Sequence, residues 1–325
     1  MKNPANVGEK KRGGVIKDKH MPFALSTSWN AFRHDNAKDM LFEIKKLGFR
    51  DVELGFNLSP LMVTDAAKLQ KKGEVRILSI HNFCPIPRGL KRNIVLPDYY
   101  AMSSLDEDER ALSLKYTRKT IDTAALLGAK AVVLHCGRVQ IPDKTRALIA
   151  LYEAGLKDTG EFRAQKSSMQ KERKVSSGPF FQNTLRSLNI LNSYARKKGV
   201  RLGIETRFYH REIPSIEEIG IILKEFKGGN LSYWHDTGHA QLMENLGFWR
   251  HMQYLDLYGS SMLGIHLHDI TKGRDHQAPG KGEFDFRILK KYLNSAVLKI
   301  LEIHQPATAG DIKEATKYIS GLLNG

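Results

Sequence analysis

Cysteine is scarce in this chain, with only Cys84 and Cys136 among 325 residues. Two cysteines cannot form a disulfide framework, and so low a number is typical of a reducing compartment. We therefore expect a cytoplasmic protein with both thiols buried or incidental. No apolar run approaches the roughly 18 residues that a membrane-spanning helix needs. The first twenty residues contain no apolar stretch longer than Val15-Ile16, which argues against a secretory signal peptide.

Acidic residues are also few, with 35 Asp and Glu against 51 Lys and Arg, which gives a formal net charge of +16. Such an excess favours anionic partners such as phosphorylated sugars or nucleic acid, although general solubility is the commoner explanation. Basic residues crowd residues 1–20 and about 156–178. We expect a disordered basic tail over residues 1–20, followed by a single domain over 21–325 with a basic insertion at about 156–178.

Glycine-rich phosphate-binding turns are missing, because no predicted strand is followed by a Gly-x-Gly-x-x-Gly turn or a P-loop. Hydrophobic runs predict eight strands at 22–27, 51–54, 75–80, 131–134, 200–204, 231–236, 262–267 and 297–301. Helices are expected at 36–47, 60–72, 104–128, 143–155, 180–198, from 215 and at 310–323, with capping boxes at Ser104 and Ser215. Eight strands alternating with helices predict an α/β fold of the (β/α)8 TIM-barrel type, and a doubly wound sheet is the disfavoured alternative.

Carboxylate and imidazole side chains mark the ends of most of the predicted strands. They are Glu53, His81, His135, Glu205, Asp236, His266 and Glu302. In a barrel the carboxyl ends of all strands meet at one rim, so these residues should converge on one cavity. Any one of them has an ordinary explanation, because a strand-end acid often caps the next helix. Together they would repel each other and take up protons unless a cation neutralised them, so the set predicts a divalent metal site.

Several of these residues stand in strings that resemble the xylose isomerase-like TIM barrels. The strings are Ser79-Ile80-His81-Asn82, Val133-Leu134-His135-Cys136-Gly137, Gly203-Ile204-Glu205-Thr206-Arg207, His235-Asp236-Thr237-Gly238-His239-Ala240, Gly264-Ile265-His266-Leu267-His268-Asp269, His276 with Gly280-Lys281-Gly282-Glu283, and Leu301-Glu302. The resemblance covers roughly residues 21–323. The family contains sugar isomerases and epimerases, and also the endonuclease IV class of apurinic/apyrimidinic (AP) endonucleases.

The resemblance implies an isomerase or epimerase that acts on a sugar or sugar phosphate with one divalent ion, Mn, Mg, Co or Zn. The metal ligands would be Glu205, Asp236, His266 and Glu302. The ion would polarise the carbonyl of the chelated carbohydrate. Glu205 and Glu302 would be the catalytic residues that move a proton off and onto the adjacent carbon. The substrate would be bound by Arg207, His239 and His268.

Two alternatives stay open. In the endonuclease branch, a second or third ion would use the positions that match His81, His135, His239 and His276. The acidic position of the third zinc site falls on Arg274, which cannot bind zinc, although Asp275 could replace it with a shift of one residue. A nucleic-acid partner is therefore not favoured. The other alternative is a barrel that binds a metal and a small ligand without turnover. A homo-oligomer is compatible with the sequence, and no role is assigned to His34, His210, His251 or His304.

Overall fold

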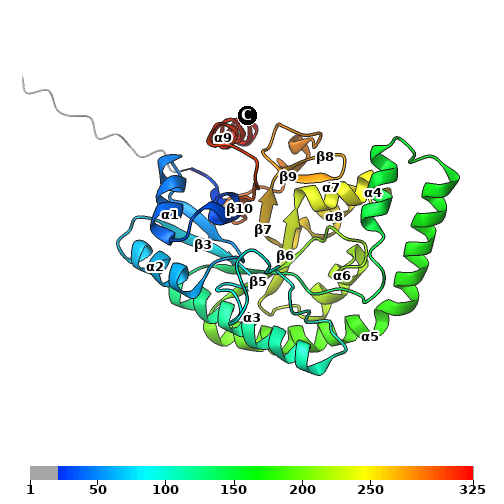
Figure 1. Ribbon diagram of the computed structural model, residues 1–325, viewed down its shortest axis with the longest axis horizontal. Coiled ribbons are helices and arrows are strands. Elements are labelled where there is room, and N and C mark those ends of the chain that lie inside the picture. The colour runs from blue at the N-terminus through cyan, green and yellow to red at the C-terminus, as the bar shows by residue number, and fades with distance from the viewer. Residues whose placement is uncertain (1–20, 325) are drawn as a thin grey trace, which may run out of the picture.

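The computed structural model describes residues 21–324, so the basic tail predicted for residues 1–20 lies outside the described residues. Eight parallel strands form a closed barrel (Figure 1), which confirms the predicted TIM barrel. Around the barrel the strands follow the order β1 (Ala24–Ser26), β10 (Leu298–Leu301), β7 (Met262–Leu267), β6 (Leu231–Asp236), β5 (Arg201–Glu205), β4 (Ala131–Leu134), β3 (Arg76–His81) and β2 (Asp51–Leu54). Each strand lies within two residues of its predicted range.

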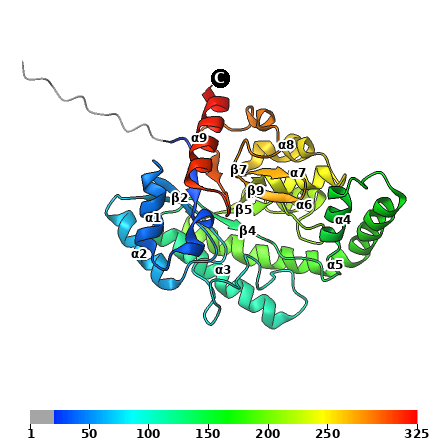
Figure 2. The ribbon, with the colours of Figure 1, turned by 45° about the horizontal axis from the view of Figure 1, so that its top comes forward.

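Helices cover the outside of the barrel (Figures 1 and 2). They are α1 (Ala37–Lys46), α2 (Pro60–Lys71), α3 (Glu107–Leu127), α4 (Thr145–Glu153), α5 (Gly160–Lys198), α6 (Ile216–Glu225), α7 (Thr237–Asn245), α8 (His251–Tyr258) and α9 (Ala309–Asn324). After β7 the chain forms an antiparallel hairpin of two short strands, β8 (Asp269–Thr271) and β9 (Arg274–Gln277). Among residues 21–324, no helix is both long and apolar enough to cross a membrane.

Side-chain caps explain where two of these helices begin. The capping box predicted at Ser215 is present, because its hydroxyl accepts from the Glu218 amide and the Glu218 carboxylate accepts from the Ser215 amide. The box predicted at Ser104 is wrong. Asp106 caps α3 instead, by accepting from the amides of the first turn, and the Ser104 hydroxyl donates to Glu109 at 2.7 Å. A carboxylate can accept two such amides, which accounts for the later start of α3.

The basic insertion expected at about 156–178 is mostly helical. α5 runs without a break through this segment and through Pro179, so the helix start expected near residue 180 is wrong. The segment is rich in Lys, Glu, Gln and Arg, which are good helix formers. Arg173, within it, is buried and donates to both carboxylate oxygens of Glu218 on α6, at 3.1 and 2.7 Å. α4 and α5 lie together at one side of the barrel (Figures 1 and 2).

The β8–β9 hairpin, which the sequence did not predict, touches α4 at its tip. The Gly273 amide donates to a carboxylate oxygen of Glu153 at 3.3 Å, and Lys272 Nζ donates to the Glu153 carbonyl at 3.2 Å. A side chain at Gly273 would come within 2.2 Å of the Ile149 methyl group, so only glycine permits this close approach. The hairpin and α4 therefore support each other beside the barrel mouth.

The barrel interior has a small apolar core below its mouth. It consists of Ala24, Leu78, Ala131, Val133, Trp234, Leu298 and Ile300. Added Cβ atoms at Gly203 and Gly264 would come within 2.7 and 2.2 Å of the Trp234 ring, so the indole fits only because both positions are glycine. The indole meets the imidazole of His266 edge-on, with 5.1 Å between the ring centroids. Trp234 thus forms a floor directly under His266.

Candidate metal centre

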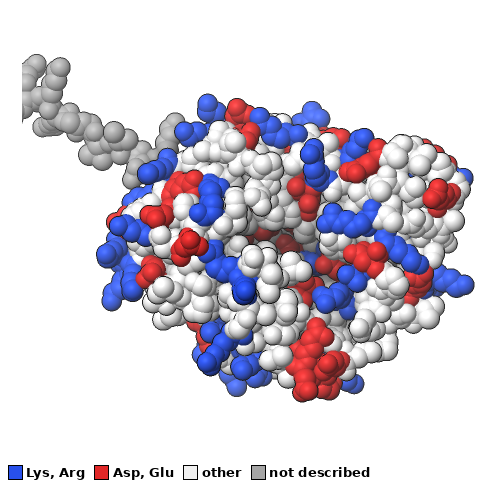
Figure 3. Space-filling view, in the orientation of Figure 1, with Lys and Arg blue, Asp and Glu red and all other residues white. Residues whose placement is uncertain are grey.

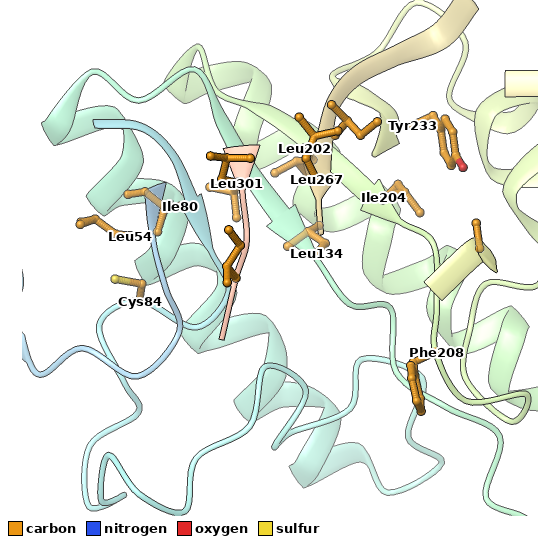
Figure 4. Close-up of a cluster of buried hydrophobic side chains, with 14 of the residues drawn as sticks. Leu54, Ile80, Cys84, Leu134, Leu202, Ile204, Phe208, Tyr233, Leu267 and Leu301 are labelled. Atoms are coloured by element: carbon orange, nitrogen blue, oxygen red, sulfur yellow. The ribbon is translucent and has the colours of Figure 1, made fainter. Parts of the chain in front are cut away.

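Alternation along the strands turns the polar residues into the barrel. An apolar core between barrel and helices contains Leu54, Ile80, Leu134, Ile204, Leu267 and Leu301 (Figure 4). Neighbouring residues of a strand point to opposite faces. The residues that consequently face the interior are Glu53, His81, His135, Glu205, His266 and Glu302. Asp236 joins them because Tyr233 belongs to the outer core and His235 contacts His251 on α8.

His266 lies at the centre of the four predicted metal ligands. Its Nδ1 atom is 2.7 Å from Glu205 Oε1, 2.8 Å from Glu302 Oε2 and 3.8 Å from Asp236 Oδ2. All four side chains are buried, and their ligand atoms lie within 4.8 Å of one another. Three carboxylates and one imidazole at this spacing fit a small divalent cation such as Mn, Mg, Co or Zn.

The charges of these groups also fit a cation. Burial alone would raise the pKa of Glu205, but its contacts with His135, His266 and His81 hold that pKa well below its usual value. Burial acts in the same direction on Glu302, and His266 and His276 likewise reverse it, so the pKa of Glu302 is also held low. A group of ionised, buried carboxylates needs positive charge beside it, and a divalent ion supplies that charge.

Glu53 holds His266 from the other side of the imidazole. Its two carboxylate oxygens lie 3.1 and 3.2 Å from His266 Nε2, and Ser79 Oγ donates to one of them at 2.7 Å. Metal-bound histidines commonly donate their second ring N–H to a carboxylate, which fixes the tautomer and directs the other nitrogen to the ion. The sequence identified Glu53 only as one of the converging acids, and the geometry makes it a positioning residue for His266.

Glu53→Gln should weaken the binding of Mn²⁺ about 10- to 100-fold, because a neutral amide no longer polarises the His266 N–H. Isothermal titration of the metal-free protein with Mn²⁺ measures the change. Ser79→Ala is the matched control, since it removes the hydrogen bond to Glu53 but keeps the carboxylate on His266, and its effect should be smaller. An unchanged Mn²⁺ affinity in Glu53→Gln would show that Glu53 does not support the metal centre.

A second cluster of ligand atoms shares Glu205 with the first. His135 Nε2 lies 2.7 Å and His81 Nε2 3.6 Å from Glu205 Oε2, and the three residues bring ligand atoms within 4.8 Å of one another. Burial, followed by the charge of Arg207, lowers the pKa of His135 to about 3. Its imidazole is therefore neutral at physiological pH, which is the state that binds metals.

A third cluster extends from the first toward the β8–β9 hairpin. Its ligand atoms come from Asp236, His239, His268 and His276. His239 Nδ1 donates to the Thr206 carbonyl at 2.9 Å, so in the neutral ring Nε2 is the nitrogen that can accept. Asp275 Oδ2 lies 3.6 Å from that nitrogen and 2.9 Å from His276 Nδ1. Asp275, and not the exposed Arg274, therefore occupies the acidic position beside these histidines.

His268 takes a place that differs from the expected one. It is fully buried and does not line the cavity. Its Nδ1 accepts from the His276 amide at 2.9 Å, so the proton is on Nε2, which donates to Asp236 at 2.9 Å. We expected His268 to bind the substrate, whereas this geometry puts it behind Asp236, where it orients the carboxylate.

His304 lines the cavity, although the sequence analysis gave it no role. The His276 ring stacks in parallel between His304 and His268, with centroid distances of 3.8 and 4.1 Å. His276 has a φ of 54°, a left-handed conformation that costs a non-glycine residue on the order of 1 kcal/mol. Its carbonyl accepts from the His304 amide at 3.0 Å, which helps to hold that conformation. His304 lies two residues after Glu302 but beyond the end of β10, where the alternation of a strand does not apply, so the sequence held no signal for it.

Arg207 is more constrained than a substrate-binding arginine would be. It is buried, and its two terminal nitrogens donate to Glu205 Oε2 at 3.2 Å and to Glu212 Oε1 at 2.8 Å. Burial would lower the pKa of Arg207, but Glu212 and Glu205 raise it above its usual value, so the side chain is always charged. Arg207 lines the cavity, but one terminal nitrogen holds Glu205 and the other holds Glu212, and Nε has no partner among residues 21–324.

The clusters border a cavity of about 330 Å³ at the barrel mouth. Glu205 and Glu302 line this cavity, whereas Asp236 and His266 are fully buried beside it. Figure 3 shows a hollow near the centre of this face with acidic side chains inside it. Residues higher in the cavity include Phe56, Leu96, Arg146, Phe208 and Tyr209. A volume of this size accommodates one small polar ligand, such as a monosaccharide.

The chain matches the family described as xylose isomerase-like TIM barrels over residues 41–320. Among solved structures, it is similar to a D-tagatose 3-epimerase-like protein, with 19% identity, a TM-score of 0.64 and coverage of 93% of this chain and 97% of that one. It is also similar to the 3-keto-D-glucoside 4-epimerase YcjR from E. coli in its apo form, with 15% identity, a TM-score of 0.64 and coverage of 93% of this chain and 99% of that one. The third is D-allulose 3-epimerase from Methylomonas sp. in complex with D-allulose, with 15% identity, a TM-score of 0.63 and coverage of 94% of this chain and 97% of that one. At these identities the likeness establishes the fold alone.

A curated relative is the uncharacterized protein y4fM of Sinorhizobium fredii (strain NBRC 101917 / NGR234). It is 23% identical over 184 residues, which is 56% of this chain. The match spans about half, 49%, of that relative's length.

Proposed function

Because the chain belongs to the xylose isomerase-like TIM-barrel family, we propose that it is a divalent-metal-dependent isomerase or epimerase of a sugar or sugar phosphate. The observation that carries this proposal is the approach of Glu205, Asp236 and Glu302 to His266 Nδ1, with the two glutamates lining a cavity of monosaccharide size. The names of the structural neighbours, which include epimerases of D-allulose and of 3-keto-D-glucosides, support the same class of reaction.

Glu205, Asp236, His266 and Glu302 would hold the ion, which, when bound, would supply Lewis acidity to a carbonyl and a hydroxyl of the sugar. Glu205 and Glu302 come from β5 and β10, which lie on opposite sides of β7 in the barrel. A substrate carbon above His266 would therefore have one carboxylate on each side. One glutamate can take the proton from this carbon, and the other, after it has taken up a proton from solvent, can donate that proton to the opposite face. Arg207, through its ion pair with Glu205, would keep that carboxylate ionised and in place.

His239 is the residue we assign to hydrogen bonding with the substrate. Its Nδ1–H donates to the Thr206 carbonyl, so in the neutral ring Nε2 is the acceptor, and His239 lines the cavity. A sugar hydroxyl can donate to this nitrogen, and the same atom is the one that would bind a second ion. The role of His239 thus depends on how many ions the protein holds.

The test is hydrogen exchange between substrate and solvent. Purified protein loaded with Mn²⁺, Mg²⁺, Co²⁺ or Zn²⁺ is incubated in D2O with a panel of ketoses and ketose phosphates. We expect deuterium at the carbon next to the carbonyl of at least one sugar, together with a new isomer. A new isomer without deuterium would reject proton transfer in favour of a hydride shift. If the protein binds metal but yields neither a new isomer nor deuterium in any sugar, the result would support a barrel that binds a metal and a small ligand without turnover.

A second candidate function is cleavage of a phosphodiester at an abasic site in DNA. The observation that favours it is that the second and third clusters share Glu205 and Asp236 with the first, so that several ions would lie side by side. Adjacent ions are suited to displacement at phosphorus, because they stabilise both the attacking and the leaving oxygen. Metal analysis and a nuclease assay separate the two candidates. Close to three zinc ions per chain, with cleavage of an abasic duplex, would overturn the isomerase proposal.

A further inference from the structure

Arg146, an exposed residue of α4, extends its guanidinium over the cavity mouth. The guanidinium lies 5.3 Å from the centre of the Phe208 ring and 5.2 Å from that of Tyr209. Its Nη2 atom donates to the Tyr209 hydroxyl at 2.5 Å. Stacking on aromatic rings holds a guanidinium plane in position while its remaining N–H groups stay available. Arg146 is therefore a fixed cation at the edge of the site.

The other charged side chains in the upper cavity already have partners. Glu212 accepts from Arg207 at 2.8 Å, and Asp98 accepts from Arg138 at 3.3 Å. The deeper carboxylates surround the imidazoles of the metal clusters. In the described part of the chain, Arg146 has no carboxylate within ion-pair distance. Its positive charge is thus left uncompensated in the free protein.

Only one ring separates this cation from the metal clusters. Phe208, on which the guanidinium stacks, meets the His239 imidazole edge-on with 5.7 Å between centroids. His239 belongs to the third cluster, whose Asp236 is also one of the four residues around the proposed ion. A sugar bound to the ion by one end can therefore reach Arg146 with its other end.

We propose that Arg146 is a specificity residue that binds a terminal anionic group, a phosphate or a carboxylate, on the sugar. A guanidinium donates two parallel hydrogen bonds to either group. The inference rests on the proposed function, since it assigns the far end of the same substrate. From sequence, Arg207 was the arginine expected to bind the substrate. The terminal nitrogens of Arg207 are engaged by two glutamates, and the free cation comes from α4 instead.

Binding of three sugars to the Mn²⁺-loaded protein tests this. D-Fructose, D-fructose 6-phosphate and D-fructuronate share one carbon chain and differ in the terminal group. Isothermal titration should show at least one anionic sugar binding about tenfold or more tightly than D-fructose, the effect of one charge-assisted contact. The better of the two anionic sugars tells whether the group is a phosphate or a carboxylate.

Variants of Arg146 separate its charge from its packing. Arg146→Gln keeps a polar contact to Tyr209 without the charge, and it should bring the anionic and neutral sugars to within about twofold of each other. Arg146→Lys should keep part of the preference. Arg118→Gln is the matched control, because Arg118 is also exposed and stacked on a tyrosine, 5.5 Å from Tyr194, but lies on α3 away from the cavity. It should leave the preference intact.

The outcomes distinguish this inference from the proposed function. A wild-type protein that binds D-fructose as tightly as both anionic sugars, or an Arg146→Gln variant that keeps the preference, would overturn the role of Arg146 while hydrogen exchange continued. Failure of all three sugars to bind would overturn it as well. The protein could instead prefer the anionic sugars, lose that preference in Arg146→Gln, and catalyse no hydrogen exchange. This result would support the anion contact of Arg146 and reject the proposed isomerase activity.

Discussion

Glu205→Gln and Glu302→Gln should each slow hydrogen exchange at the substrate carbon by about a thousandfold, the usual contribution of a positioned acid or base. A glutamine cannot take up a proton. In addition, each substitution changes a carboxylate that lies 2.7 or 2.8 Å from His266 Nδ1. Because the two glutamates are proposed to act on opposite faces of the carbon, neither can replace the other. Deuterium incorporation into the best substrate, at saturating metal, measures the loss.

Metal content must be determined on the same samples, because losing a ligand would also lower the activity. Glu218→Gln is the matched control, since Glu218 is another buried glutamate paired with an arginine, Arg173, but lies on α6 outside the cavity. It should lower the stability of the fold and leave exchange per folded molecule unchanged. Full exchange in either site variant with the ion bound would contradict the two-glutamate mechanism.

Removal of the divalent ion should abolish exchange and lower the melting temperature together. The ion binds only the folded chain, and at 100 times its Kd such a ligand stabilises a protein by about 2.7 kcal/mol. For a domain of this size, the stabilisation corresponds to a rise of roughly 4 °C in the melting temperature. Dialysis against a chelator followed by thermal unfolding measures the loss, and readdition of Mn²⁺, Mg²⁺, Co²⁺ or Zn²⁺ should restore both properties.

Substitutions of two carboxylates test whether the metal-dependent shift in melting temperature arises at the proposed metal centre. In Asp236→Asn, readded ion should raise the melting temperature far less than in the wild type. Asp51 is also a buried strand carboxylate, but it pairs with Arg76 at the start of β2, so Asp51→Asn should keep the full metal-dependent shift. A chelated wild type that unfolds at the same temperature and still catalyses exchange would exclude a metal enzyme.

Much of this site could be predicted from the order of residues alone. In a strand, one residue position decides whether a side chain faces the helices or the barrel axis. The run of apolar residues up to Ile204 and Leu301 therefore identifies Glu205 and Glu302 as the inward residues. This reasoning is local, and the parallel barrel then brings the strand ends together without further information.

What the sequence could not predict depends on contacts between distant segments. Arg207 was expected to contact substrate because it follows a strand-end glutamate, but its partner Glu212 becomes visible only once the chain turns back. His304 and Asp275 enter the cavity through the loop after β10 and the β8–β9 hairpin, where no periodic pattern exists. Arg146, whose charge has no carboxylate partner among the described residues, lies at the cavity mouth on a helix about sixty residues before Arg207.

The floor that Trp234 forms under His266 has a consequence for the order of events. In the part of the chain that the structure describes, the indole and the apolar side chains around it lie beneath the imidazole and fill the lower end of the barrel. An ion held at His266 must therefore come and go through the same cavity that the sugar occupies. Binding is therefore ordered: the ion binds before the sugar and dissociates after it. A saturating concentration of sugar should therefore lower the rate at which a chelator removes the ion.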